Sequence, residues 1–378
     1  MSQIQNFDID DFLRNYWQQC PMLIRGAFPK VESLIAGDDL AGLATEPNAE
    51  SRIISLDRAK DAWSLKNGPF DEEIWATLGE EDWTLLVQAV DHWDEDIAKL
   101  RNCFSFLPSW RIDDIMVSFA TKGGGVGPHF DQYDVFLIQG EGRREWKIGQ
   151  MCADDSELIE NLPVKILAQF HEEEVWVLEP GDMLYLPPAL AHWGTALENS
   201  ITYSVGFRAP AESEVMIDFG HFLSNHLSDF QRYTDQNIEN RSASNSEIKE
   251  SDIDRIQQII RGISDDRSLL ANWLGQYMTE PKYDDTAVDS GDWSLEKFAA
   301  QWPKTPLVKN TASRFAYYED RLLVDGSELE GCPEQVSKVL DRYDYFPFDA
   351  QIVNAHDLLP AIFCALVNLG ALYFDEDN

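Results

Sequence analysis

The sequence contains few cysteines, and they form no recognisable pattern. Its 378 residues include five, at widely separated positions: Cys20, Cys103, Cys152, Cys332 and Cys364. An odd number without any Cys-x-x-Cys pair argues against a disulfide framework and against a zinc knuckle. We therefore expect reduced thiols and a cytoplasmic protein.

Basic residues are also scarce. Thirty Lys and Arg stand against 67 Asp and Glu, which gives a formal net charge of −37. Such a charge repels nucleic acid and anionic membranes and attracts basic proteins. We expect no direct nucleic-acid binding and a basic protein as partner, with acidic charge that serves solubility alone as the alternative.

Long apolar runs are missing as well. No stretch approaches the roughly 18 apolar residues that a membrane helix needs. The N-terminal MSQIQNFDIDDFLRNYW is acidic and lacks the basic and apolar regions of a signal peptide. The sequence therefore predicts neither a membrane span nor a secretion signal.

Apolar residues are nevertheless plentiful, at 44% of the chain with 20 Phe, 12 Trp and 12 Tyr, which indicates a folded protein. Its length exceeds the about 250–300 residues of a single core, so we expect two or three domains. Residues 108–208 hold short β-type runs between Gly and Pro, typical of an antiparallel barrel or sandwich. Residues 38–100 are predicted to be mainly helical, helices return after Pro210, and the acidic segment 282–292 is a candidate linker.

The segment GGGVGPHFDQYDVFLIQG (123–140) contains a candidate half of a metal site. If it enters a strand, His129 and Asp131 project from one face, because residues i and i+2 do so. One imidazole nitrogen and one carboxylate oxygen would then reach the same ion. A chance His-x-Asp pair is the alternative, since the chain is so acidic.

A second segment, EPGDMLYLPPALAHWG (179–194), supplies His192 after an apolar strand and a Pro-Pro turn. Together the two segments match the two halves of a cupin-type metal site. Two histidines and one carboxylate leave positions open on the metal and suit Fe(II) oxygen chemistry. A loop histidine in contact with solvent is the alternative interpretation of His192.

The segment REWKIG (144–149) offers a cation for an anionic cosubstrate. Alternation places Arg144 on the apolar, inward face with Trp146 and Ile148, and Lys147 on the outer face. A buried arginine needs an anionic partner, and the far carboxylate of 2-oxoglutarate fits it in a bidentate manner. A structural Asp or Glu is the alternative partner. By the same alternation, Ser118, Thr202 and Ser204 are candidate pocket donors.

These segments, together with ENSITYSVGFRAP (198–210), resemble the JmjC-type, cupin-superfamily ribosomal oxygenases of bacteria, the family that hydroxylates an arginine of a ribosomal protein. The resemblance implies an α+β protein with a double-stranded β-helix core, a helical dimerisation region and a winged-helix-like C-terminal domain. The corresponding ranges are 1–208, 209–281 and 293–378. A homodimer is implied as well.

By position, the resemblance makes His129, Asp131 and His192 the ligands of Fe(II), and Arg144 and Ser118 the residues that bind 2-oxoglutarate. The implied activity is a 2-oxoglutarate-dependent dioxygenase that uses O₂ to hydroxylate an arginine of large-subunit ribosomal protein number sixteen. A strongly acidic enzyme suits so basic a substrate.

A target arginine would need acidic or hydroxyl partners near the iron. Candidate substrate residues are Tyr133, Asp134 and Ser204, with Asp113 and Asp114 as further acidic candidates; solvated turn aspartates are the alternative. Two other functions stay open: hydroxylation of a histidine in another ribosomal protein, and a metal-binding cupin adaptor that docks basic proteins without chemistry.

Overall fold

The computed structural model describes residues 4–29, 34–60, 62–228, 230–236, 246–283 and 291–375. Contacts within the chain divide it into two units, Met1–Ala209 and Pro210–Asn378. Most of the candidate linker 282–292 lies outside the described residues. No helix in the described part of the chain is both long and apolar enough to cross a membrane.

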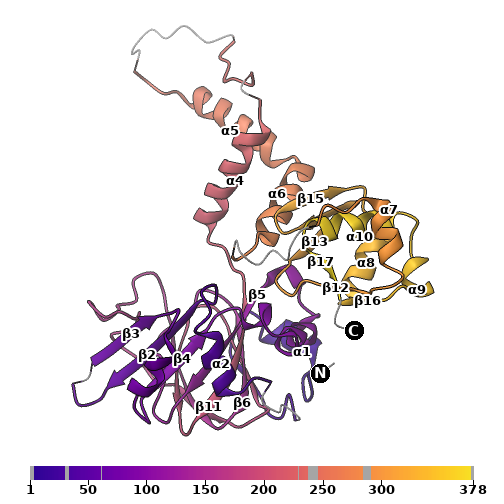
Figure 1. Cartoon of the computed structure of the whole chain (residues 1–378). Helices are drawn as coiled ribbons and strands as arrows, with labels where there is room; N and C mark the ends of the chain where they lie inside the picture. Colours follow the sequence, from indigo (N-terminus) through magenta and orange to yellow (C-terminus); the bar gives the residue numbers. More distant parts are fainter. Residues whose placement is uncertain are drawn as a thin grey trace. The chain divides into compact units, whose positions relative to one another are not determined.

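Two antiparallel sheets build the first unit (Figure 1). The larger sheet has eight strands, in the spatial order β1 (Met22–Ile24), β9 (Met183–Leu186), β6 (Val135–Glu141), β11 (Ser200–Phe207), β5 (Ile112–Ala120), β4 (Trp83–Val87), β2 (Ser51–Asp57) and β3 (Ala62–Asn67). The smaller sheet has three strands, in the order β10 (Leu190–Ala196), β7 (Arg144–Met151) and β8 (Glu174–Leu178). The antiparallel β-structure predicted for residues 108–208 is confirmed.

The prediction for residues 38–100 was wrong in part. One short helix, α2 (Gly37–Leu43), lies there, but β2, β3 and β4 extend the larger sheet beyond β5. β2 has a fully apolar pair, Ile53 and Ile54, that is buried on both faces. Short apolar runs of this kind fit a buried strand and a buried helix equally well, and pairing with β5 decides for the strand.

One face of the larger sheet, the inner face, packs against the smaller sheet. A shared apolar cluster connects them, with Val135 and Leu137 from β6 and Trp146 and Ile148 from β7. Cross-strand partners share a face, so the strand register defines which residues point inward. Along β5 and β11 these are Asp114, Met116, Ser118, Ala120, Ser200, Thr202, Ser204 and Gly206.

The opposite, outer face of the larger sheet carries the main core. Helix α1 (Ile9–Asn15) places Phe12 against Phe136 and Tyr185, with ring centroids 5.5 and 4.9 Å apart. The Asp8 side chain caps this helix by accepting from the backbone N–H of Asp11. The remaining helices of the unit are short: η1 (Glu72–Thr77), η2 (Val90–His92), α3 (Glu95–Ala98), η3 (Lys99–Phe104) and η4 (Ser109–Arg111).

The second unit begins with three helices, α4 (Glu212–His226), α5 (Glu250–Ser264) and α6 (Arg267–Thr279), and α6 contacts the other two. The remaining elements surround a second core: α7 (Leu295–Gln301), β12 (Leu307–Lys309), β13 (Phe315–Tyr318), β14 (Arg321–Val324), β15 (Ser327–Glu330), α8 (Glu334–Arg342), β16 (Tyr345–Phe346), α9 (Ala350–Val353), α10 (Leu359–Asn368) and β17 (Leu372–Phe374). The strands form two three-stranded sheets, β16-β12-β17 and β13-β14-β15.

Candidate metal centre

Three side chains with metal-binding atoms meet at one end of the barrel. One ligand atom each from His129, Asp131 and His192 lies within 4.8 Å of the other two. His192 Nε2 is 3.6 Å from Asp131 Oδ2, and the two imidazole rings have centroids 4.3 Å apart. The structure therefore brings together all three residues that the sequence singled out as metal ligands.

The local backbone differs from the expectation. His129 and Asp131 precede strand β6 and do not lie within it, whereas His192 lies in strand β10. The His129 N–H donates to the carbonyl of His192 at 3.0 Å, and the His192 N–H donates to the carbonyl of His129 at 2.8 Å. This isolated β-bridge fixes the two histidines side by side although 62 residues separate them in the chain.

Both rings are oriented by their own backbone. His129 Nδ1 lies 2.9 Å from the carbonyl of Gly127, and His192 Nδ1 lies 2.9 Å from the carbonyl of Leu190. A carbonyl only accepts, so Nδ1 carries the proton in both rings and Nε2 has its lone pair free for a metal. Burial, with repulsion from His129, lowers the pKa of His192 to about 4, so its imidazole is neutral near pH 7.

The glycines before His129 allow close backbone contacts. A Cβ on Gly124 would lie 2.2 Å from the carbonyl oxygen of Trp83, and one on Gly125 would lie 2.3 Å from that of Gly194. The Gly123 N–H donates to the Ala196 carbonyl at 2.8 Å, which ties the loop to strand β10. The glycines therefore allow the loop to pack directly on neighbouring backbone.

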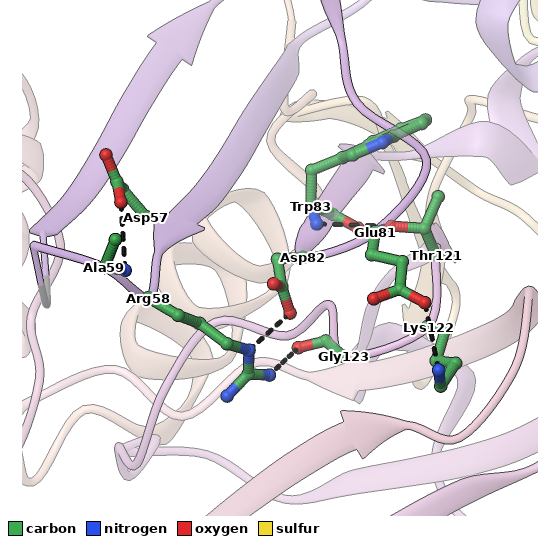
Figure 2. A network of polar contacts seen from close by, with 9 residues as sticks. All are labelled: Asp57, Arg58, Ala59, Glu81, Asp82, Trp83, Thr121, Lys122 and Gly123. Atoms are coloured by element: carbon green, nitrogen blue, oxygen red, sulfur yellow. Dashed lines mark hydrogen bonds and ion pairs between the residues drawn. The ribbon is translucent and has the colours of Figure 1, made fainter.

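Polar contacts attach the same loop to the β2–β3 turn and to the segment before β4 (Figure 2). Arg58 donates from Nε to Asp82 Oδ1 at 2.7 Å and from Nη2 to the Gly123 carbonyl at 3.2 Å. Lys122 pairs with Glu81 at 2.9 Å. The strands β2–β4 thus support the loop that leads to the first candidate metal ligand.

Arg144 is buried on the inward side of β7, as alternation predicted, and is 5% exposed. Its Nη1 donates to the hydroxyls of Ser118 and Thr202, both at 3.2 Å, and its Nε has no hydrogen-bond partner in the described part of the chain. Burial alone lowers its pKa to about 10, with no contribution from a carboxylate among the described residues. A buried cation without a carboxylate partner among the described residues suits an anionic ligand.

The two hydroxyls beneath Arg144 have different roles. Thr202 accepts from Arg144 and donates its own proton to Gln139 Oε1 at 3.3 Å, while the Gln139 amide donates to backbone carbonyls. Ser118 accepts from Arg144 and has a hydroxyl proton left to donate. The sequence analysis did not identify Gln139. This polar residue continues the alternation of Val135 and Leu137 along the strand, and that pattern could have placed it on the inner face.

Tyr133 lies beside the candidate metal ligand Asp131, and both Tyr133 and Asp114 lie beside Gly206. An added Cβ on Gly206 would be 3.7 Å from Asp114 Oδ1 and 3.9 Å from the Tyr133 ring. Desolvation and the carboxylates of Asp131 and Asp114 raise the pKa of Tyr133 well above its ordinary value, so its phenol stays protonated. Ser204 is on the same inner face, two positions from Gly206, and 7% exposed.

Two of the other acidic candidates are engaged elsewhere. Asp134 is fully buried, accepts from Tyr185 at 2.7 Å and from Gln18 at 3.0 Å, and pairs with Arg111 at 3.5 Å. Asp113 lies at an irregularity in the β5–β11 register and is 4.0 Å from Arg208. Both positions correspond to structural roles, which leaves Asp114 as the acidic candidate on the inner face.

Comparison with known proteins gives consistent results. A model of the JmjC domain matches residues 99–215. The ribosomal protein uL16 3-hydroxylase of Escherichia coli is 39% identical over 277 residues, which is 72% of each chain. A probable ribosomal oxygenase of Haemophilus influenzae is 38% identical over 54% of this chain and 50% of its own length.

Solved structures extend the similarity to nearly the whole chain. The ribosomal oxygenase YcfD from Escherichia coli, in complex with cobalt and 2-oxoglutarate, is 31% identical, with a TM-score of 0.89 over 99% of this chain and all of that one. Its complex with cobalt and succinic acid has a TM-score of 0.88 at the same identity and coverage. The chain therefore belongs to the JmjC-domain ribosomal oxygenases of bacteria.

Proposed function

We propose that this protein is an Fe(II)- and 2-oxoglutarate-dependent dioxygenase that hydroxylates an arginine side chain of a basic large-subunit ribosomal protein, in the cytoplasm. The observation that supports it best is one arrangement of residues. The His129, Asp131 and His192 ligand set shares the barrel interior with Arg144, a buried cation whose pKa burial alone lowers.

The donor set fits iron. Two neutral imidazoles with free Nε2 atoms and one carboxylate form the 2-His-1-carboxylate combination, which leaves positions for a bidentate cosubstrate and O₂. The carbonyls of Gly127 and Leu190 hold the tautomers that this binding requires. We assign His129, Asp131 and His192 as the iron ligands on this basis.

The opposite end of the interior fits a carboxylate. Arg144 offers its guanidinium, and the Ser118 hydroxyl has a proton to donate after accepting from Arg144. Thr202 positions Arg144, because its own proton is engaged by Gln139. We assign the far carboxylate of 2-oxoglutarate to Arg144 and Ser118.

When bound, iron and 2-oxoglutarate supply the oxidation of an unreactive C–H bond by O₂, with succinate and CO₂ as the other products. The residues of the chain position the reactants and keep water out. Leu137, Trp146 and Ile148 belong to one buried apolar cluster, and Trp146 and Ile148 lie next to the ligand His192. The neutral phenol of Tyr133 can donate a hydrogen bond without adding negative charge near the Asp131 carboxylate.

The target side chain is proposed to be arginine because an acidic residue lies on the inner face near the metal. Asp114 is 4% exposed and accepts from the Ala89 N–H at 3.0 Å and the Gln88 amide at 3.3 Å, which fix its orientation. Carboxylate oxygens accept more than one hydrogen bond, so a guanidinium can still bind. Tyr133 and Ser204 are the proposed flanking contacts, and we assign no substrate contact to Asp134.

The partner is proposed to be basic because the net charge of −37 favours encounter with a basic protein and disfavours nucleic acid. We further propose that the chain is a homodimer formed by the helical region 209–281, with a winged-helix-like domain at 293–378. Helix α5 supports the dimer, since Ile253, Ile256, Ile259 and Ile260 are each between 43% and 57% exposed.

Incubation with Fe(II), 2-oxoglutarate and a panel of ribosomal peptides tests the activity, read as the gain of one oxygen by mass spectrometry with fragmentation to locate it. The expected result is oxidation of an arginine in the large-subunit protein and no reaction with a His129→Ala variant. Oxidation of a histidine in another peptide would contradict the arginine assignment. Peptide binding without 2-oxoglutarate consumption would favour an adaptor.

A further inference from the structure

A buried donor in the barrel interior has no partner among the described residues. Trp146 is 5% exposed, and its indole Nε1 is buried without a hydrogen-bond acceptor. Leaving a buried N–H unpaired is costly, and native proteins rarely do so. Together with Arg144 Nε, it is one of two unpaired nitrogen donors on the same side of strand β7.

The position of the ring is well defined. Trp146 lies opposite Gly194 in the β7–β10 ladder, and a Cβ on Gly194 would be 2.7 Å from Cη2 and Cζ3 of the indole. The benzene half therefore covers the Gly194 backbone. Nε1 is on the other edge of the indole, so the donor points away from β10.

The same ring connects the two ends of the site. The guanidinium carbon of Arg144 is 5.5 Å from the Trp146 ring, and the His192 ring centroid is 5.9 Å from it. Trp146 thus borders the space between the proposed carboxylate-binding cation and a proposed iron ligand. A dicarboxylate that spans these two residues passes alongside the indole.

We propose that the Trp146 indole N–H donates a hydrogen bond to a carboxylate oxygen of 2-oxoglutarate and is a third cosubstrate-binding group beside Arg144 and Ser118. This inference rests on the proposed function. Indole nitrogen only donates, and Arg144 and Ser118 are donors too, so the three groups match an acceptor-only ligand. Trp146 also separates the cation from the metal ligand and so sets the position of the cosubstrate along the barrel.

The test is an NMR titration with protein labelled with ¹⁵N at its indole nitrogens. Twelve tryptophans give a resolvable spectrum, and Trp146→Phe assigns the relevant resonance. Zn(II) replaces iron so that no turnover occurs, and 2-oxoglutarate is added. We expect the Trp146 indole proton to shift downfield and to exchange more slowly with water, saturating with the binding isotherm.

Affinity supplies the second measurement. Trp146→Phe should weaken 2-oxoglutarate binding about tenfold, and so should 3-benzothienylalanine at position 146, which preserves the ring shape but removes the N–H. This isostere keeps the test valid if the Phe variant folds poorly. Trp176→Phe is the matched control, because Trp176 pairs with Trp146 on the edge strand β8 and should leave the affinity unchanged.

The outcomes separate two failures. Two results would overturn this inference and leave the proposed function intact. In one, wild-type protein binds 2-oxoglutarate but the Trp146 resonance does not shift. In the other, the isostere variant binds 2-oxoglutarate with unchanged affinity. Wild-type protein with Zn(II) that does not bind 2-oxoglutarate at all would overturn both.

Discussion

Arg144 donates a hydrogen bond to Ser118 across the barrel interior, from Nη1 to Oγ at 3.2 Å, and no carboxylate among the described residues contributes to its pKa. The strands β7 and β5 that carry the two residues belong to different sheets. A cation and a hydroxyl therefore converge on one point inside the protein, where both can serve the same anion.

Replacing Arg144 with methionine should separate stability from binding. The folded-state pKa of Arg144 is lowered to about 10, so at any pH below that value its charge reduces the free energy of unfolding. We expect Arg144→Met to be at least as stable as wild type at pH 7 in urea unfolding. Its Kd for 2-oxoglutarate should rise by about 30-fold or more, since truncating a buried charge partner costs about 2–5 kcal/mol. A large loss of stability would show that Arg144 already has a structural counter-charge.

Replacing Asp131 with asparagine should impair metal binding. Loss of a residue that only orients a ligand costs about 10–100-fold in affinity, so loss of a ligand should cost more than about 100-fold. Calorimetry with Co(II) measures the effect.

Asp134→Asn is the contrasting control. Its contacts with Tyr185 and Gln18 are structural, so it should lower the free energy of unfolding by about 1–3 kcal/mol and leave Co(II) affinity unchanged. Equal metal affinities for the two variants would contradict the assignment of Asp131.

A methyl group on Gly125 should disturb the loop before His129. Its Cβ would lie 2.3 Å from the Gly194 carbonyl, so Gly125→Ala should lower the free energy of unfolding by about 1–3 kcal/mol and weaken Co(II) binding. Gly220→Ala in helix α4 is the matched control. Nothing lies within 4 Å of its Cβ, and alanine there should stabilise by about 0.5–1 kcal/mol. A loop that tolerates alanine would show that it is free to move.

Substrate recognition can be tested at Asp114. We expect Asp114→Asn to raise the KM for the ribosomal peptide about 10- to 100-fold, because a hydrogen bond to a charged group is worth about 1.5–3 kcal/mol, while the Kd for 2-oxoglutarate stays the same. Asp113→Asn, next in the chain and 4.0 Å from Arg208, is the neighbouring control and should behave as wild type. Equal KM values for the two variants would remove Asp114 from the substrate site.

The proposed dimer depends on the apolar residues of α5. Ile256→Glu should convert a dimer to a monomer in light scattering, since burying a carboxylate at an apolar interface is unfavourable. Gln257→Glu adds the same charge at the adjacent position and should leave the mass unchanged. A wild-type monomer would exclude the dimer directly.

The cluster of His129, Asp131 and His192 and the inward position of Arg144 could be predicted from two sequence patterns. Alternation along a strand places Arg144 inward with Trp146, and two motifs 63 positions apart contribute His129 and His192. The same alternation places Ser118 and Thr202 on the inner face.

Other features depend on partners that are distant in the sequence. Strands β2–β4 extend the larger sheet because β4 pairs with the edge of β5. Asp134 has a structural role because Tyr185 and Gln18 donate hydrogen bonds to it. The close approach of Gly125 to Gly194 depends on how β10 packs against the loop. Local sequence contains no record of these neighbours.

The backbone bridge between His129 and His192 has a consequence for metal supply. Two carbonyl-oriented imidazoles joined by backbone hydrogen bonds do not need an ion to hold them together. The cage is therefore rigid before loading, and one divalent metal can replace another without refolding. The metal that occupies the site then depends on relative metal concentrations in the cell and on the Irving–Williams order. Zinc or copper would therefore displace iron and inactivate the enzyme whenever their free concentrations rise.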